Sequence, residues 1–220
     1  MQNSPLNRID PDGLTDYTIS GNGKIEMVAG TETEDGNDRL IRGKAKYKKN
    51  GNIRGKEGKK YIEMEKGILD EMETDGENFQ VFKMESGEEA EEVYDFIGNA
   101  INAEMGKYDI IRGDGTEESI FRTSFEWGSI GGGTASLENL LDQDPDLQLV
   151  SVMHNHGNNP DPNSNSVGSY SPSGRKPGDI SGDVPQAAHL NNVFINQANR
   201  PRYFIWRFGR RTEYDENTRK

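Results

Sequence analysis

Cysteine is absent from the sequence, and only three histidines occur among the 220 residues. Disulfides and thiolate metal ligands are therefore excluded, so a metal ion would have to be held by His, Asp, Glu or water. Long apolar runs are also absent. No stretch reaches the roughly 18 apolar residues of a membrane-spanning helix, and the N-terminus lacks the basic-then-apolar pattern of a signal peptide. We expect no membrane partner and no signal peptide of the chain's own.

Basic residues are fewer than acidic residues. The chain has 26 Lys and Arg against 38 Asp and Glu, which gives a formal net charge of -12. Affinity for nucleic acids comes mostly from Lys and Arg that neutralise phosphates, so the charge predicts no nucleic-acid partner. A basic stretch, "GKAKYKKNGNIRGKEGKK" (residues 43–60), interleaves with glycines and has acidic neighbours. We interpret it as a solvated hairpin.

Glycine, with 26 residues, is abundant and favours many turns and short strands, which indicates an α+β class. Three parts are predicted. Residues 1–13 read as a linker or the remnant of a preceding unit, because Pro and Gly are concentrated there. Residues 14–75 read as a polar β-hairpin region around the strand-like pieces "KIEMVAG" and "KKYIEMEKG". Residues 76–220 carry firmer patterns and are predicted to form the main domain.

Alternation and helical spacing give the elements of the main domain. Ser86 and Glu89 have the spacing of a capping box that opens a helix from residue 88, whose apolar stripe is expected to be core. Alternating strands are expected at "NFQVFKM" and "SIFRTSFEWGSI", then a short helix "SLENLL", the strand "LQLVSVMHNH", a helix "VPQAAHLNNVFINQ" and two closing strands around a Gly turn.

The pair His154 and His156 ends the strand "LQLVSVMHNH". Side chains at i and i+2 of a strand point to the same face, so the two imidazoles could share one cation, while Asn155 points away. A catalytic zinc typically takes three protein ligands, so a third ligand is required. Two surface histidines at a strand end remain the alternative interpretation.

Asp183 is the candidate third ligand. It begins the last helix, since Pro185 fits a first helical turn and Ala187 and Leu190 follow Asp183 on one face. An ordinary N-cap is the alternative for this residue. Glu126, set between aromatic residues on an alternating strand, is the candidate general acid/base, with an exposed strand face as its alternative. The third histidine, His189, lies off the face of Asp183 and is expected at the surface.

This order, a Glu on a strand, then His-x-His, then a Ser-containing loop and an Asp opening a helix, resembles the JAB/MPN (JAMM) metalloprotease family. The resemblance covers roughly residues 79–215. It implies an α/β/α arrangement of the cytidine-deaminase-like type, a mixed sheet flanked by helices. It also implies Zn²⁺ held by His154, His156 and Asp183, with Glu126 as general acid/base, and hydrolysis of peptide or isopeptide bonds in a protein substrate.

The sequence departs from the family pattern after His156. Gly157 stands where the family usually has Pro, and Ile180 stands three residues before Asp183, where the family has Ser. Ser181 or Ser173 could supply the oxyanion-stabilising hydroxyl instead, and Asp179 is a fallback ligand. Two alternatives follow: a non-catalytic JAB-like binding module, and a metal-dependent nuclease, which the acidic charge disfavours.

The first residues suggest a biological setting. The segment "QNSPLNRIDPDGL" resembles the end of an Rhs/YD-repeat core, which precedes variable C-terminal toxins. That resemblance implies a JAB-like toxin domain of a polymorphic Rhs-type effector, enclosed by an Rhs shell in a longer precursor. It further implies a cognate immunity protein and delivery into a target cell, where the toxin acts in bacterial competition.

Overall fold

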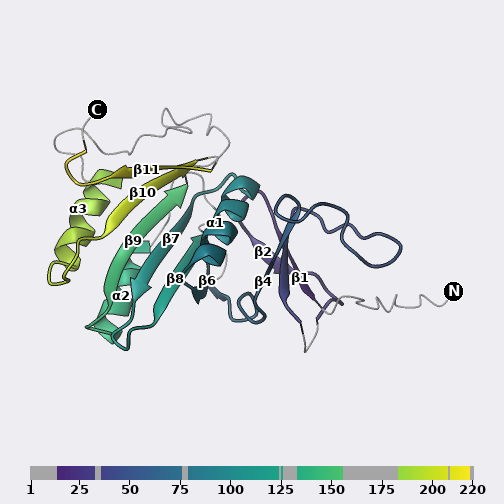
Figure 1. The fold of residues 1–220 in the computed structure, drawn as a ribbon, viewed down its shortest axis with the longest axis horizontal. Coiled ribbons are helices and arrows are strands. Elements are labelled where there is room, and N and C mark those ends of the chain that lie inside the picture. Colours follow the sequence, from purple (N-terminus) through teal and green to yellow (C-terminus); the bar gives the residue numbers. More distant parts are fainter. Residues whose placement is uncertain are drawn as a thin grey trace.

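The computed structural model describes residues 14–32, 36–75, 79–123, 125, 133–155, 183–207 and 209–218. These residues form a mixed α+β structure with two β-sheets and three helices (Figure 1). In chain order the elements are β1 (Thr15–Ile19), β2 (Ile25–Met27), β3 (Asp38–Arg42), β4 (Tyr61–Met64), β5 (Glu73–Asp75), β6 (Phe79–Glu85), α1 (Glu88–Ala100), β7 (Met105–Ile111), β8 (Glu117–Thr123), α2 (Gly133–Gln143), β9 (Gln148–Asn155), α3 (Asp183–Val193), β10 (Arg202–Arg207) and β11 (Arg210–Tyr214).

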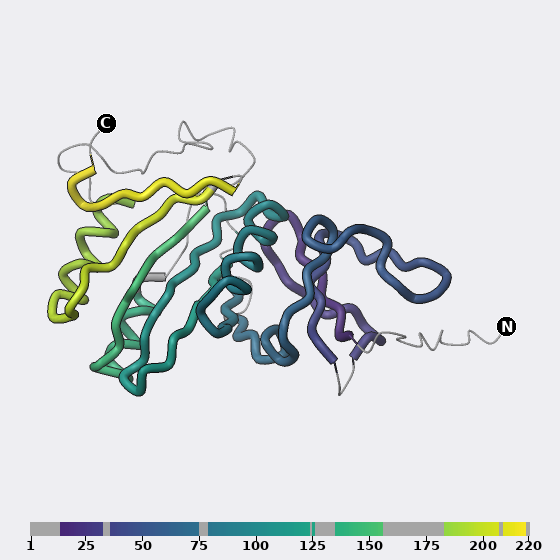
Figure 2. Tube along the Cα trace, viewed as in Figure 1, coloured from purple at the N-terminus to yellow at the C-terminus, as the bar shows by residue number. Residues whose placement is uncertain are grey.

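The first sheet has the strand order β2-β1-β3-β4. Its β1 and β3 are parallel, and the other two pairs are antiparallel. The two strand-like pieces expected in this region correspond to β2 and β4, whereas β1 and β3 were not predicted. The connection between β3 and β4 leaves the sheet as a long projecting loop (Figure 2).

The second sheet has the order β11-β10-β9-β7-β8-β6-β5. Only β9 and β10 are parallel within it; its other pairs are antiparallel. The strand expected around "LQLVSVMHNH" is confirmed as β9, which lies near the centre of the sheet. The two closing strands around a glycine turn are confirmed as β10 and β11, with Gly209 in the left-handed region at φ 73°.

Helix α1 confirms the predicted apolar stripe, since its members are all buried: Ala90, Val93, Phe96, Ile97, Ala100 and Ile101. The predicted capping box is wrong. The N-cap residue is Gly87, and no side chain caps the helix. The Ser86 hydroxyl instead contacts Ser119 at 2.9 Å and Asp109 at 3.3 Å, so it joins a polar network of the sheet rather than the helix start.

Helices cover both faces of the second sheet. Helix α1 packs against one face in a core cluster that also contains Tyr17 and Ile25 of the first sheet and Trp206 of β10. Helices α2 and α3 pack against the other face, around Tyr108, Val152 and other residues of the central strands (Figure 1). None of the three helices in the described ranges has the length and apolar character needed to cross a bilayer.

Candidate functional site

His154 lies near the end of β9, on the sheet face that α2 and α3 cover. It is paired in register with Gly106 of β7 and with Ile205 of β10. Its side chain is buried, with the whole residue 3% exposed. A polar ring in this position needs a partner, because an unpaired buried polar group is costly.

Asp183 provides that partner from the first residue of α3. Its Oδ1 lies 3.1 Å from Nε2 of His154, and Asp183 is itself buried. Position in the first helical turn favours a carboxylate, because the free N–H groups there carry partial positive charge. The expected helix start at Asp183 is confirmed, and Ala187 and Leu190 lie in the core as predicted.

The charge around His154 alters its protonation. Burial is the largest influence and acts to lower the pKa of His154, but Asp183 and then Glu104 act to raise it. The net result is a pKa above the usual value of the imidazole. Glu104 directly precedes β7 and is half-buried. It is a carboxylate of this site that sequence reasoning missed, because its place depends on the pairing of β7 with β9.

Tyr108 contributes a hydroxyl to the same face of the sheet. Gly106 leaves the space for it: a Cβ atom at Gly106 would lie 2.9 Å from Oη of Tyr108. Because Gly106 pairs with His154, the hydroxyl lies beside the histidine's strand position. Tyr108 is 2% exposed, and its hydroxyl has no hydrogen-bond partner among the described residues. Burial raises its pKa to about 12, so the group is a neutral donor at ordinary pH.

Tyr214 of β11 is the last residue of the candidate site around His154. Its ring meets the His154 ring edge-on, with centroids 6.2 Å apart. Burial raises the pKa of Tyr214, and Asp183 and Tyr108 are among the neighbours that add to this effect. The site therefore combines one imidazole, one carboxylate at a helix start and two buried phenols, with Glu104 at its edge.

Several predicted site residues lie outside the described part of the chain: His156, Glu126, Ser181, Ser173 and Asp179. Phe125, which precedes Glu126, is described and has a φ of 57°. The described part of strand β8 ends at Thr123. A bulky residue in the left-handed region is strained, and such strain concentrates at functional sites.

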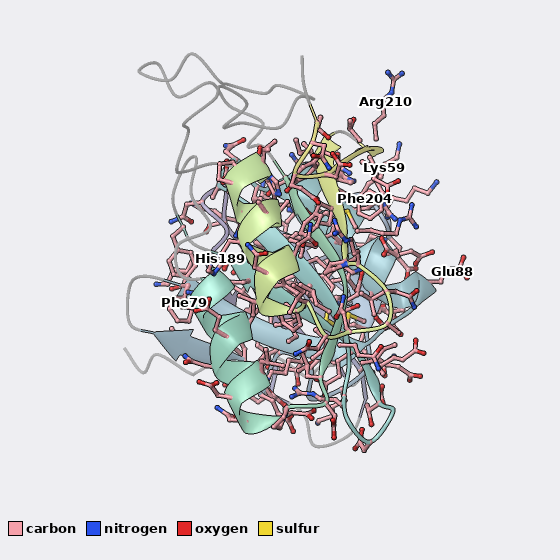
Figure 3. The ribbon with its side chains drawn as sticks, turned by 90° about the vertical axis from the view of Figure 1, so that its left-hand side faces the viewer. Lys59, Phe79, Glu88, His189, Phe204 and Arg210 are labelled. Atoms are coloured by element: carbon pink, nitrogen blue, oxygen red, sulfur yellow. The ribbon has the colours of Figure 1, made fainter. Side chains whose placement is uncertain are left out.

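The structure agrees with the predicted orientations of Asn155 and His189. Asn155 points away from the His154 face; its Oδ1 accepts a hydrogen bond from the backbone of Met105 at 2.5 Å, and its Nδ2 donates to Ala103. His189 lies on the exposed side of α3, 2.7 Å from Glu138 of α2 (Figure 3). The prediction of a surface histidine is confirmed.

Within the described ranges, no group of three or more His, Asp or Glu side chains is arranged to hold a metal ion. His154 and Asp183 are the two predicted ligands that the structure brings together. Two ligands alone do not complete a zinc site.

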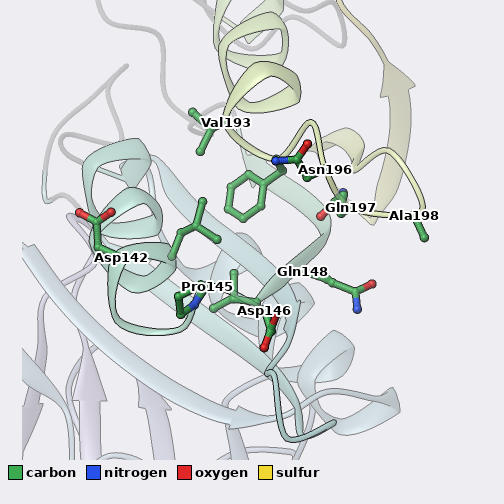
Figure 4. Close-up of a pocket in the computed structure, with 11 residues that line it drawn as sticks. Asp142, Pro145, Asp146, Gln148, Val193, Asn196, Gln197 and Ala198 are labelled. Atoms are coloured by element: carbon green, nitrogen blue, oxygen red, sulfur yellow. The ribbon is translucent and has the colours of Figure 1, made fainter.

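A surface cavity of about 530 Å³ lies elsewhere, between the ends of α2 and α3 (Figure 4). Its lining includes Asp142, Gln148 and Gln197. Gln148 begins β9, so the cavity is at the opposite end of that strand from His154. Gln197 is occupied in holding the backbone of Leu149 through two hydrogen bonds. The cavity and the histidine site are therefore separate.

No protein-family model, curated protein or solved structure matches the chain. The α+β class stands on the observed elements alone.

Proposed function

We propose that the chain is a zinc-dependent amide hydrolase of the JAB/MPN (JAMM) type, a peptidase or isopeptidase. The observation that carries the proposal is the buried contact between His154, at the end of a central strand, and Asp183, at the start of a helix 29 positions later. The zinc site implied by the family resemblance requires these two side chains to be in contact. Their separation of 29 positions in the sequence does not by itself bring them together.

The chemistry of the two side chains fits a zinc ion. Ligand atoms about 2.1 Å from a tetrahedral zinc lie about 3.4 Å from each other. The separation of 3.1 Å between His154 Nε2 and Asp183 Oδ1 is close to that value. His156 is the other proposed histidine ligand, and Asp179 is the fallback for Asp183. Zinc held by these residues would polarise a substrate carbonyl and lower the pKa of water in its open position.

Glu126 is proposed to take a proton from water and deliver it to the leaving amine, the task of a general acid/base. Glu104 is the second carboxylate that the site offers for this role, because it lies close enough to raise the pKa of His154. Ser181, or Ser173, is proposed to donate a hydrogen bond to the oxyanion. The Tyr108 hydroxyl is a further donor on the same face.

The biological proposal rests on the resemblance of the first residues to the end of an Rhs core. The chain would be the toxin of a polymorphic Rhs-type effector, delivered into a target cell, where it hydrolyses amide bonds of a protein. An immunity protein of the producing cell would block it. This setting predicts toxicity when the chain is expressed alone inside bacteria.

The test combines metal content with toxicity. Purified chain is analysed for zinc, and growth and new protein N-termini are measured in cells expressing each form. His154→Ala, Asp183→Asn and Glu126→Gln should abolish toxicity, and the first two should also lose zinc. His189→Ala is the matched control, because it removes an exposed histidine away from the site.

Zinc that is retained at full stoichiometry in His154→Ala would overturn the ligand assignment. Zinc bound by a wild-type chain that yields no new N-termini and no growth defect would favour a non-catalytic JAB-like module. Toxicity lost in Glu104→Gln but kept in Glu126→Gln would transfer the proton-transfer role to Glu104.

A further inference from the structure

The positive charge of the chain is concentrated in one segment. Residues 42–60 contain nine of the 26 Lys and Arg but only one of the 38 Asp and Glu. Positive and negative charge are therefore unevenly distributed along the chain. Residues 42–60 are basic, and the rest of the chain is more negative than the total of -12.

This segment is the projecting loop between β3 and β4, and the loop has internal order. Tyr47 and Ile53 form an antiparallel bridge. Lys48 N donates to Asn52 O at 2.8 Å, and Arg54 N donates to Lys46 O at 2.6 Å, so the two arms pair as a hairpin. We call residues 42–60 the basic hairpin.

Two side chains fix the basic hairpin to the first sheet. Ile53 is 4% exposed. The Tyr47 hydroxyl donates to Oδ2 of Asp16 at 2.6 Å, and the other oxygen of Asp16 accepts from Arg39. The apolar side chains of the segment thus turn inward, and the cations are left on the outside.

Most cations of the basic hairpin are exposed, and among the described residues none of them is paired with a carboxylate. Eight are exposed and Lys60 is half-buried, and none forms an ion pair with a carboxylate of the described residues. Lys46 and Arg54 stand opposite each other across the hairpin, an arrangement of like charges that destabilises the pair. Burial, then Lys46 and Arg42, lower the pKa of Lys60, as expected in a positive potential.

We propose that the basic hairpin binds the phosphate backbone of nucleic acid without sequence preference. The exposed cations, with Glu57 as the one carboxylate of the segment, match the charge of a phosphodiester chain. Lysine predominates over arginine, which suits contact with diffuse charge more than bidentate recognition of single groups.

An acidic protein surface fits the basic hairpin less well. The cores of protein–protein interfaces are depleted in Lys and enriched in aromatic residues. The basic hairpin has the opposite character: Ala45, Tyr47 and Ile53 are not exposed, so no apolar side chain is available for a partner's core. Interfaces with nucleic acid are by contrast polar and strongly positive.

Position separates this surface from the candidate site. The basic hairpin projects from the first sheet, on the side of the molecule away from β10, β11 and α3 (Figures 1 and 2). Binding there would hold the chain on nucleic acid while leaving the His154 region free. The expectation of no nucleic-acid partner came from the net charge of the whole chain. That number does not reflect the local positive charge of the basic hairpin.

The experiment measures anisotropy of a short fluorescein-labelled duplex DNA, and of a single-stranded RNA, titrated with the full chain between about 50 and 200 mM salt. The test variant carries K46Q, K48Q and R54Q. The matched control carries K24Q, K83Q and R210Q, which remove the same charge from exposed positions outside the basic hairpin. Circular dichroism verifies that both variants fold.

We expect the wild type and the control to bind, with affinity falling by about two to three powers of ten across this salt range if about five cations touch phosphates. The test variant should bind about tenfold or more weakly, with a smaller salt slope. Equal binding by test and control variants, or no binding by the wild type at low salt, would overturn the proposal. Polyglutamate or phosphatidylserine-containing vesicles that bind as tightly as DNA would overturn the choice of nucleic acid.

Discussion

The indole of Trp206 lies against the backbone of Gly98 in α1, so closely that a Cβ atom at Gly98 would be 2.6 Å from Cζ3 of the ring. Trp206 is fully buried, and its Nε1 donates to Oδ1 of Asp95, also on α1, at 2.6 Å. The ring cannot turn away without breaking this bond. A glycine in the middle of a helix is therefore explained by packing.

Gly98→Ala should destabilise the chain although alanine is the better helix former. Helix propensity favours Ala by about 1 kcal/mol. Overpacking against the fixed indole typically costs about 1–3 kcal/mol. We expect a net loss of up to about 2 kcal/mol in urea unfolding, against a change within about 0.5 kcal/mol for exposed Asn99→Ala in the same helix. A more stable Gly98→Ala variant would show that the indole is free to move.

Gln80→Ala should loosen the first sheet. Gln80 of β6 accepts from Ile25 N at 2.7 Å and donates to Ile25 O at 2.8 Å, which joins the second sheet to β2 of the first. Removal leaves two buried backbone groups unpaired, at about 1–3 kcal/mol each. Amide exchange at Ile25 should accelerate strongly. Exposed Gln143→Ala serves as control, and unchanged exchange at Ile25 would mean that β2 is held by other contacts.

Asp109→Asn should alter stability in a pH-dependent way. Burial acts to raise the pKa of Asp109, but Lys107 and hydrogen bonds from Ser119 and Ser151 lower it overall. A carboxyl with a lowered folded pKa contributes stability above its unfolded pKa of about 3.9, and this is lost as pH falls through the folded value.

At neutral pH we expect Asp109→Asn to lose about 3 kcal/mol, because buried Lys107 keeps only Glu91 as its partner. The difference from wild type should narrow in acid below about pH 4. Asp142→Asn, at an exposed carboxyl of α2, is the control. A difference that stays constant down to low pH would contradict an ionised Asp109.

Tyr108→Phe and Tyr203→Phe should have opposite effects. The Tyr108 hydroxyl is buried without a described partner, so its removal should raise stability by about 1 kcal/mol, or about 2–4 °C in Tm for a chain of this size. Tyr203 donates to Asn191 at 3.0 Å, so Tyr203→Phe should lower stability by a similar amount. Destabilisation by Tyr108→Phe in calorimetry would reveal a partner outside the described residues.

Zinc should stabilise the wild type and not Asp183→Asn. A ligand that binds only the folded state adds about 2.7 kcal/mol at a hundred times its Kd. Thermal unfolding with added zinc, then with a chelator, measures the shift and its reversal. His189→Ala should respond as wild type. An equal response in Asp183→Asn would place any zinc elsewhere.

Elements with strong periodicity were predictable from the sequence. The apolar stripe of α1 and the face shared by Ala187 and Leu190 in α3 follow from helical spacing, and β9 follows from its apolar alternation. Strand β3 was missed because "DRLIR" is short and charged, and its parallel partner β1 is distant in sequence. The pairing of strands that are distant in sequence cannot be predicted from the local pattern of apolar and polar residues.

The candidate site was predictable only in part. His154 and Asp183 were found by residue type and helix-start chemistry, and their contact agrees with that reasoning. Glu104 and Tyr108 were missed, because their places depend on the register in which Gly106 meets His154. Ser86 was misjudged because its hydroxyl had a better partner in Asp109 and Ser119 than in the helix.

The long-range contacts of β10 bear on how the chain acquires its structure. Trp206 shares a core with Tyr17, and Ile205 is the neighbour of His154 in the sheet. Contacts of such sequence separation are slow to form, because loop closure must precede them. During synthesis, β1 to β9 all emerge before β10 can pair. The candidate site around His154 would therefore form late in folding. Until β10 pairs with β9, a nascent chain would contain the residues of the site without their folded arrangement.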